Sequence, residues 1–210
     1  MSSEQAHVEE WLNAVSHGVG WLLSAVGLGL LVRAYWQASV PAFAGAVAFG
    51  TALVAMYGAS TLYHGWPEGP VKRWLRRVDH ATIFLLIAAT YTPFTLAVLE
   101  PAWGLPAFGT VWAIAGTGAV WKFVDVDGLP GPNYAVYLVL GWIAVVLMYP
   151  LATALPTAAF LLLIAGGLAY SGGTVFYAWE SLPFNHSVWH LFVIAGSACH
   201  YASVFAIAGG

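Results

Sequence analysis

The chain contains the stretch PTAAFLLLIAGGLAYSGGTVFYAW (Pro156–Trp179), in which no residue carries a charge. A helix of this length matches the roughly 30 Å hydrocarbon core of a bilayer. Comparable apolar stretches recur along the whole chain. Backbone polar groups that face lipid must be satisfied within their own segment, and the sequence lacks the short alternating strands of a membrane barrel. The pattern therefore predicts an all-α bundle of transmembrane helices.

The composition of the chain supports the same fold class. Hydrophobic residues make up 60% of the 210 residues and charged residues only 7%, whereas a soluble domain has about 25% charged residues. The formal net charge is −3, and most of the few basic residues lie in one loop, so we expect no nucleic-acid partner. Cys199 is the single cysteine and cannot form an internal disulfide. We expect one membrane domain over residues 1–210, surrounded by membrane lipid.

Polar residues, prolines and glycines divide the chain into seven expected spans. Their approximate bounds are Val15–Trp36, Val40–Tyr63, Val78–Leu99, Trp103–Phe123, Tyr134–Pro150, Pro156–Trp179 and His186–Ile207. Residues 1 to about 14 form a short polar segment before the first span. This segment lacks the features of a secretory signal, so we expect it to be retained.

The orientation in the membrane follows from the loop GWPEGPVKRWLRR (Gly65–Arg77). This loop contains most of the positive charge of the chain, in Lys72, Arg73, Arg76 and Arg77. Basic loops of membrane proteins remain in the cytoplasm. Seven spans then place the N-terminus inside and the C-terminus outside, with Arg33 as the one basic residue that opposes this orientation.

Three histidines near the ends of spans are candidate metal ligands. His186 and His190 are four residues apart, so a helix places them on one face about a turn apart, which suits a shared metal. His64, at the end of the second expected span, could supply a third nitrogen and leave an open position on a zinc ion. Alternatively, the three side chains could simply form hydrogen bonds at the interface or with neighbouring helices. Their spacing leaves both interpretations open.

Ser60 and Asp79 lie close to these histidines along the chain. Ser60 is one helical turn before His64, where its hydroxyl could approach a bound metal or bond to a carbonyl one turn back. Asp79 opens the third expected span, where a carboxylate needs a cation, a helix N-terminus or a metal-bound water. The alternative role for Asp79 is a helix cap beside Arg76 and Arg77.

Other ionisable residues receive no role from the sequence. His200 is ten residues beyond His190, or about 15 Å along a helix, which is too far to bind the same ion. Glu10, Asn13 and His17 could form one helix face, which we expect at the membrane interface. The role of His80 also stays open.

Four motifs follow one another along the chain: EWLNAVSHGVG (Glu10–Gly20), STLYH (Ser60–His64), VDHATIFLLIAATYTPF (Val78–Phe94) and HSVWH (His186–His190). Together they resemble the haemolysin III family, the bacterial branch of the progestin and adipoQ receptor proteins, which is related to the alkaline ceramidases. The resemblance implies a seven-helix bundle in a bacterial inner membrane.

The resemblance also implies a set of site residues. It carries a zinc site near the cytoplasmic side over to His64, His186 and His190. An aspartate and a serine accompany the zinc-bound water in such proteins, and the matching positions are Asp79 and Ser60.

Three functional hypotheses are compatible with these residues. The first is a zinc-dependent membrane hydrolase of a lipid-like amide or ester, with Asp79 as general base and Ser60 orienting water or stabilising an oxyanion. The second is a membrane sensor or regulator in which zinc is a structural clamp between the second and seventh helices. The third, a lytic pore, is prompted by the family name alone, and polar residues are sparse beyond the cytoplasmic third of the spans. The sequence does not define the substrate or the oligomeric state.

Overall fold

The structure is a computed structural model that describes residues 3–124 and 133–208, and every regular element in these ranges is a helix. The elements are α1 (Ser3–Ala34), α2 (Val40–Gly65), α3 (Pro70–Ala97), α4 (Pro101–Val124), α5 (Asn133–Trp142), the 3-10 helix η1 (Ile143–Leu147), α6 (Met148–Ala154), α7 (Thr157–Ala178) and α8 (Asn185–Ala206).

Seven helical segments within the described residues are long and apolar enough to cross a membrane. Six of them are single helices, and the fifth is the composite segment Tyr134–Ala154, which joins α5, η1 and α6. The predicted seven-helix membrane bundle is therefore confirmed.

Two helices begin earlier than hydropathy predicted. Helix α1 begins at Ser3 instead of Val15, and α3 begins at Pro70 instead of Val78. The polar residues in the first turns of these two helices lower the local hydropathy, so the apolar pattern begins later than the helix. They do not end the helix itself, because their side chains find partners. Proline is also favoured in the first turn, where its missing N–H costs nothing. Gly69 precedes Pro70 with a φ of 155°, a conformation that favours glycine.

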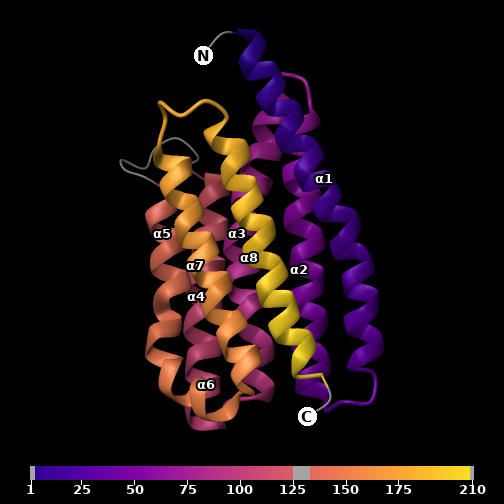
Figure 1. Cartoon of the computed structure of the whole chain (residues 1–210), viewed down its shortest axis with the longest axis vertical. Coiled ribbons are helices and arrows are strands. Elements are labelled where there is room, and N and C mark those ends of the chain that lie inside the picture. Colours follow the sequence, from indigo (N-terminus) through magenta and orange to yellow (C-terminus); the bar gives the residue numbers. More distant parts are fainter. Residues whose placement is uncertain (1–2, 125–132, 209–210) are drawn as a thin grey trace.

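Helices α1 to α4 pack side by side in chain order, α7 packs against α8, and α8 also packs against α1 (Figure 1). This contact joins the first and last helices of the chain. The N-terminus and the C-terminus lie at opposite ends of the bundle (Figure 1). The end of α2, the start of α3 and the start of α8 all lie at the N-terminal end, which positions the candidate site there.

Close helix contacts form where small residues allow them. A Cβ atom on Gly45 of α2 would lie 2.8 Å from the Cα atom of Pro93 in α3, so only glycine permits this approach.

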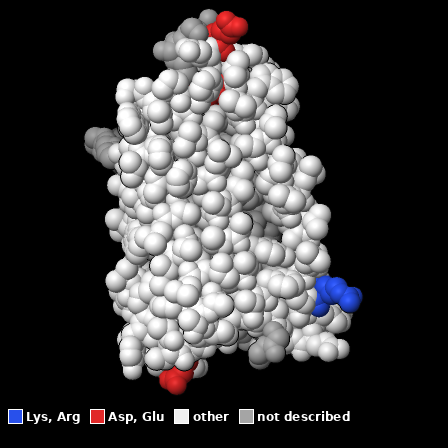
Figure 2. All heavy atoms as spheres, in the orientation of Figure 1, with Lys and Arg blue, Asp and Glu red and all other residues white. Residues whose placement is uncertain are grey.

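In the face that Figure 2 shows, coloured charged atoms occur only towards the two ends of the molecule. The uncharged region between them matches the expected hydrocarbon layer.

Candidate metal centre

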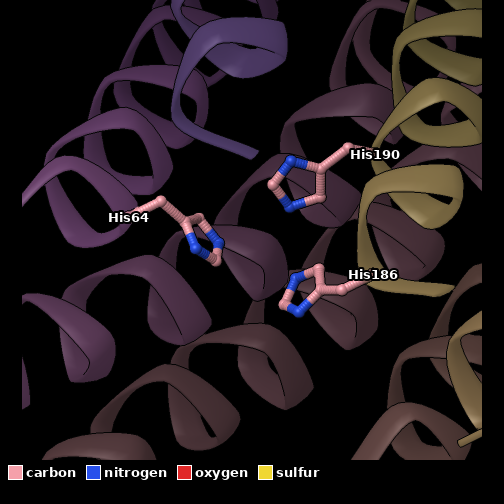
Figure 3. A group of neighbouring side chains, drawn as sticks. All are labelled: His64, His186 and His190. Carbon is pink, nitrogen blue, oxygen red and sulfur yellow. The ribbon is translucent and has the colours of Figure 1, made fainter. Parts of the chain in front are cut away.

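Three imidazole rings converge (Figure 3), and the helix ends that carry them lie at the N-terminal end of the bundle (Figure 1). His64 comes from the last turn of α2, whereas His186 and His190 come from the first two turns of α8. One donor nitrogen from each ring lies within 4.8 Å of the other two. His64 is 4% exposed and His190 is 2% exposed, whereas His186 is partly exposed, so two of the three rings are buried in protein. The structure therefore brings together the three histidines that the sequence indicated.

The hydrogen bonding of His64 tests whether this cluster fits a metal ion. Its Nδ1 atom donates to Oε1 of Glu10 over 3.2 Å, so in the neutral ring the lone pair lies on Nε2. Nε2 is fully buried and has no hydrogen-bond partner. A buried acceptor without a partner is unusual in a protein interior, and a metal ion would satisfy it. The cluster therefore fits a metal ion that prefers nitrogen ligands.

One face of α1 covers the histidine cluster. The backbone N–H of His186 donates to Glu9 over 3.2 Å. The Ser187 hydroxyl donates to Oδ1 of Asn13 over 2.6 Å. His17 stacks on His190 with ring centroids 3.5 Å apart and an angle of 8° between the planes.

The expected interfacial position of the residues on this face needs correction. Asn13 is 1% exposed and His17 is 3% exposed, so both side chains lie inside the bundle. Glu10 is half-buried and bonds directly to His64. Sequence reasoning missed their place in the site, although their helical spacing was the signal that could have indicated a common inward face.

Ser60 and Asp79 both lie in the wall of the same cavity. The Ser60 hydroxyl is 2.7 Å from Nδ1 of His17, a contact that sequence reasoning did not anticipate. Asp79 lies about two and a half turns after the start of α3, so its alternative role as a helix cap was wrong. Its Oδ2 atom is 3.4 Å from Nδ1 of His80, and its side chain is 11% exposed.

A cavity of about 630 Å³ connects these residues with the interior of the bundle. Its polar end includes His17, Ser60, Asp79, His186 and His190. The remaining wall is mostly apolar and is contributed largely by α3, α7, α8 and the composite fifth span. The arrangement places ionisable groups at one end of a chamber that could hold hydrocarbon.

The two remaining histidines of interest lie outside the three-histidine cluster. His200 also borders the cavity, but its Nε2 atom bonds to the carbonyl of Leu163 in α7 over 3.1 Å. Nδ1 of His80 bonds to the carbonyl of Arg76 over 2.8 Å. Neither residue belongs to the group of converging donor atoms.

Fold and site together define a multi-pass integral membrane protein with a three-histidine cluster near one end of a seven-helix bundle. Residues 5–201 match the family described as Haemolysin-III related. The chain belongs to the haemolysin III family, as the four sequence motifs indicated.

Relatives in bacteria and animals agree with this assignment. The chain is 39% identical over 197 residues to "Hemolysin-3 homolog" of Bacillus subtilis (strain 168), which covers 93% of this chain and 92% of that protein. It is 37% identical over 197 residues to "Hemolysin-3" of Bacillus cereus, covering 93% and 90%. The human "Monocyte to macrophage differentiation factor" is 28% identical over 165 residues, covering 75% and 67%. No solved structure gives a significant match. The bacterial relatives and the seven apolar helices support a location in a bacterial plasma membrane.

Proposed function

We propose that this protein is a zinc-dependent membrane hydrolase that cleaves a lipid-like amide or ester. The observation that carries the proposal is the cavity, because it joins His186 and His190 of the cluster, together with Asp79, to an apolar chamber within the bundle. A substrate with a hydrocarbon chain could place the chain in that chamber and its polar group beside Asp79. Burial of the chain would favour binding at roughly 0.8 kcal/mol per CH₂ group.

His64, His186 and His190 would hold the metal through neutral ring nitrogens. A zinc ion with three protein ligands supplies Lewis acidity, which polarises a carbonyl and acidifies water at the remaining position. The nitrogen donors favour zinc over magnesium or calcium, which prefer oxygen ligands.

Asp79 would act as the general base. Its carboxylate borders the cavity, where it can accept a proton from an attacking water and pass it to the leaving group. The contact with His80 holds the carboxylate in place. Ser60, which also lines the cavity and pairs with His17, would orient the water or donate to the developing negative charge.

The test combines metal content with lipid turnover by the purified protein. We expect one zinc per chain in the wild type and in His200→Ala, and loss of zinc in His64→Ala, His186→Ala and His190→Ala. His200→Ala is a matched control, because His200 is a buried histidine on α8 that lies outside the cluster. Asp79→Asn should keep its zinc, and its rate of cleavage of a lipid amide or ester that the wild type cleaves should fall about 100-fold or more.

Glu180→Gln is the control for Asp79→Asn, because Glu180 also borders the cavity but is exposed. A wild-type protein with full zinc occupancy that cleaves nothing in a broad panel of lipid amides and esters would contradict the hydrolase.

One observation favours a second function, in which the metal is a structural clamp in a sensor or regulator. The cluster joins α2 to α8, and the two helices are far apart in the sequence. A clamp predicts that removal of zinc lowers the thermal stability of the protein. It also predicts that cells carrying Asp79→Asn behave as cells carrying the wild type do, whereas a hydrolase predicts that this variant loses the function of the wild type.

A further inference from the structure

Glu10 connects three helices at the histidine end of the bundle. Its Oε1 atom accepts from Nδ1 of His64 over 3.2 Å, and its Oε2 atom forms an ion pair with the Lys72 ammonium. Lys72 also donates to the carbonyl of Trp66 over 3.2 Å and is 7% exposed. The carboxylate of α1 therefore lies between the last turn of α2 and the first turn of α3.

This contact determines which nitrogen of His64 carries the hydrogen. A carboxylate oxygen only accepts hydrogen bonds, so Nδ1 of His64 must be the donor. The neutral ring then has its lone pair on Nε2, the atom that is buried without a partner. Rotation of the ring would break the bond to Glu10, so the same contact also fixes the direction of that lone pair.

Lys72 holds Glu10 in the position that this contact needs. Its side chain is almost entirely buried, and its ammonium group contacts both Glu10 and the exposed Glu68, the latter at 3.7 Å. The carbonyl of Trp66 restrains the ammonium further. Without Lys72, the carboxylate of Glu10 would lose its cation and gain freedom to turn away from His64.

His190, another histidine of the cluster, has a weaker hydrogen-bond partner on its ring than His64 has. Nδ1 of His190 lies 3.4 Å from the hydroxyl of Ser16, which is neutral and can donate or accept. Among the described contacts, Glu10 is the carboxylate that bonds to a ring nitrogen of the cluster, and that nitrogen belongs to His64. A hydrogen bond from a ligand histidine to a carboxylate raises the basicity of the metal-binding nitrogen.

We propose that Glu10, held by Lys72, is a positioning residue that sets the tautomer and orientation of His64 for metal binding. The inference rests on the zinc site of the proposed function. It assigns to the N-terminal helix a part in building the metal centre, through a residue that does not touch the metal.

The experiment measures zinc affinity by competition with a chromophoric chelator. It compares the wild type with Glu10→Gln and Glu10→Ala in detergent. Glu10→Gln keeps the size of the side chain but replaces the charged acceptor by a weaker amide, and Glu10→Ala removes the acceptor. We expect zinc affinity to fall about 10–100-fold, with Glu10→Ala the more affected.

Glu68→Gln is the matched control for these variants. Glu68 also pairs with Lys72, but its side chain is 88% exposed, and its described contacts do not include His64. We expect this variant to bind zinc as the wild type does. Lys72→Met should weaken zinc binding less than Glu10→Ala, because Glu10 remains present but is less restrained.

A second measurement reports on His64 without metal. Nitrogen-15 NMR of histidine-labelled, metal-free protein should show His64 with its hydrogen on Nδ1 in the wild type, and this preference should be lost in Glu10→Ala. Thermal unfolding of the metal-free variants separates misfolding from a change at the site.

The outcomes distinguish the inference from the proposed function. Equal zinc affinities in wild type, Glu10→Gln and Glu10→Ala would overturn the role of Glu10 and leave the zinc site intact. A hydrogen on Nε2 of His64 in the metal-free wild type would also overturn it. A wild type that binds no zinc would refute the proposed function and this inference together.

Discussion

At the scale of single residues, Gly166 shows how tightly α7 and α8 pack beside the cavity. A Cβ atom at this position would lie 2.2 Å from Cδ2 of His200 and 3.0 Å from the carbonyl oxygen of Gly196. The first contact falls on a ring that is bonded to Leu163, and the second falls on backbone. Neither neighbour can move without breaking other contacts.

We therefore expect Gly166→Ala to lower the free energy of unfolding by about 1–3 kcal/mol, as overpacking of a tight interior does. The neighbouring variant Gly167→Ala is the control, because a Cβ atom there meets nothing within 4 Å. Thermal or denaturant unfolding in detergent would measure both. Equal stability of the two variants would show that α7 and α8 can separate at this point.

At the scale of elements, the fifth span is interrupted and depends on a residue from another helix. Its α-helical hydrogen bonding changes to a 3-10 pattern between Ile143 and Leu147. The hydroxyl of Tyr91 in α3 bonds to the carbonyls of Leu140 and Gly141, at 3.1 and 2.5 Å. It also accepts from the N–H of Ala144 over 2.8 Å. A membrane interior makes such compensation necessary, because unpaired backbone groups are costly there.

We expect Tyr91→Phe to destabilise the protein by about 1–3 kcal/mol, since it leaves these backbone groups without their partner. Hydrogen exchange should become faster over residues 140–147 and stay unchanged in α2. Tyr149→Phe is the control, because Tyr149 is 78% exposed. Unchanged exchange in Tyr91→Phe would mean that the interrupted segment is held by its own packing.

At the scale of the whole molecule, the orientation of the bundle decides which compartment faces the histidine end. The basic residues at the start of α3 lie at the same end as the N-terminus (Figure 1). Basic segments stay on the cytoplasmic side. We therefore expect the histidine cluster near the cytoplasmic face.

Cysteine labelling tests this orientation. In a Cys199→Ala background, Glu100→Cys should react with a membrane-impermeant maleimide added to intact cells, whereas Glu68→Cys should react only after permeabilisation. Both positions are exposed, and they lie at opposite ends of the bundle, between α3 and α4 and between α2 and α3. The reverse pattern would place the histidine cluster on the outer side.

The sequence alone determined the parts of this protein that depend on local chemistry. Apolar length predicted the seven spans, and helical spacing placed His186 and His190 on one face of α8. It also singled out His64, Ser60 and Asp79, because polar groups in apolar spans need a reason to be there. The start of α1 could not be predicted, because hydropathy indicates which residues lie in lipid and does not indicate which polar residues before them are helical.

Only the tertiary structure decided how these residues meet. His64 reaches the α8 histidines through the packing of α1, α2 and α8, and no local pattern reports the angle at which helices cross. The same packing turned Glu10 and His17 from expected interfacial residues into contacts of His64 and Ser60. The break in the fifth span likewise depends on Tyr91, a partner about fifty residues away in the chain. Such contacts join distant segments, and their geometry exists only once the bundle has formed.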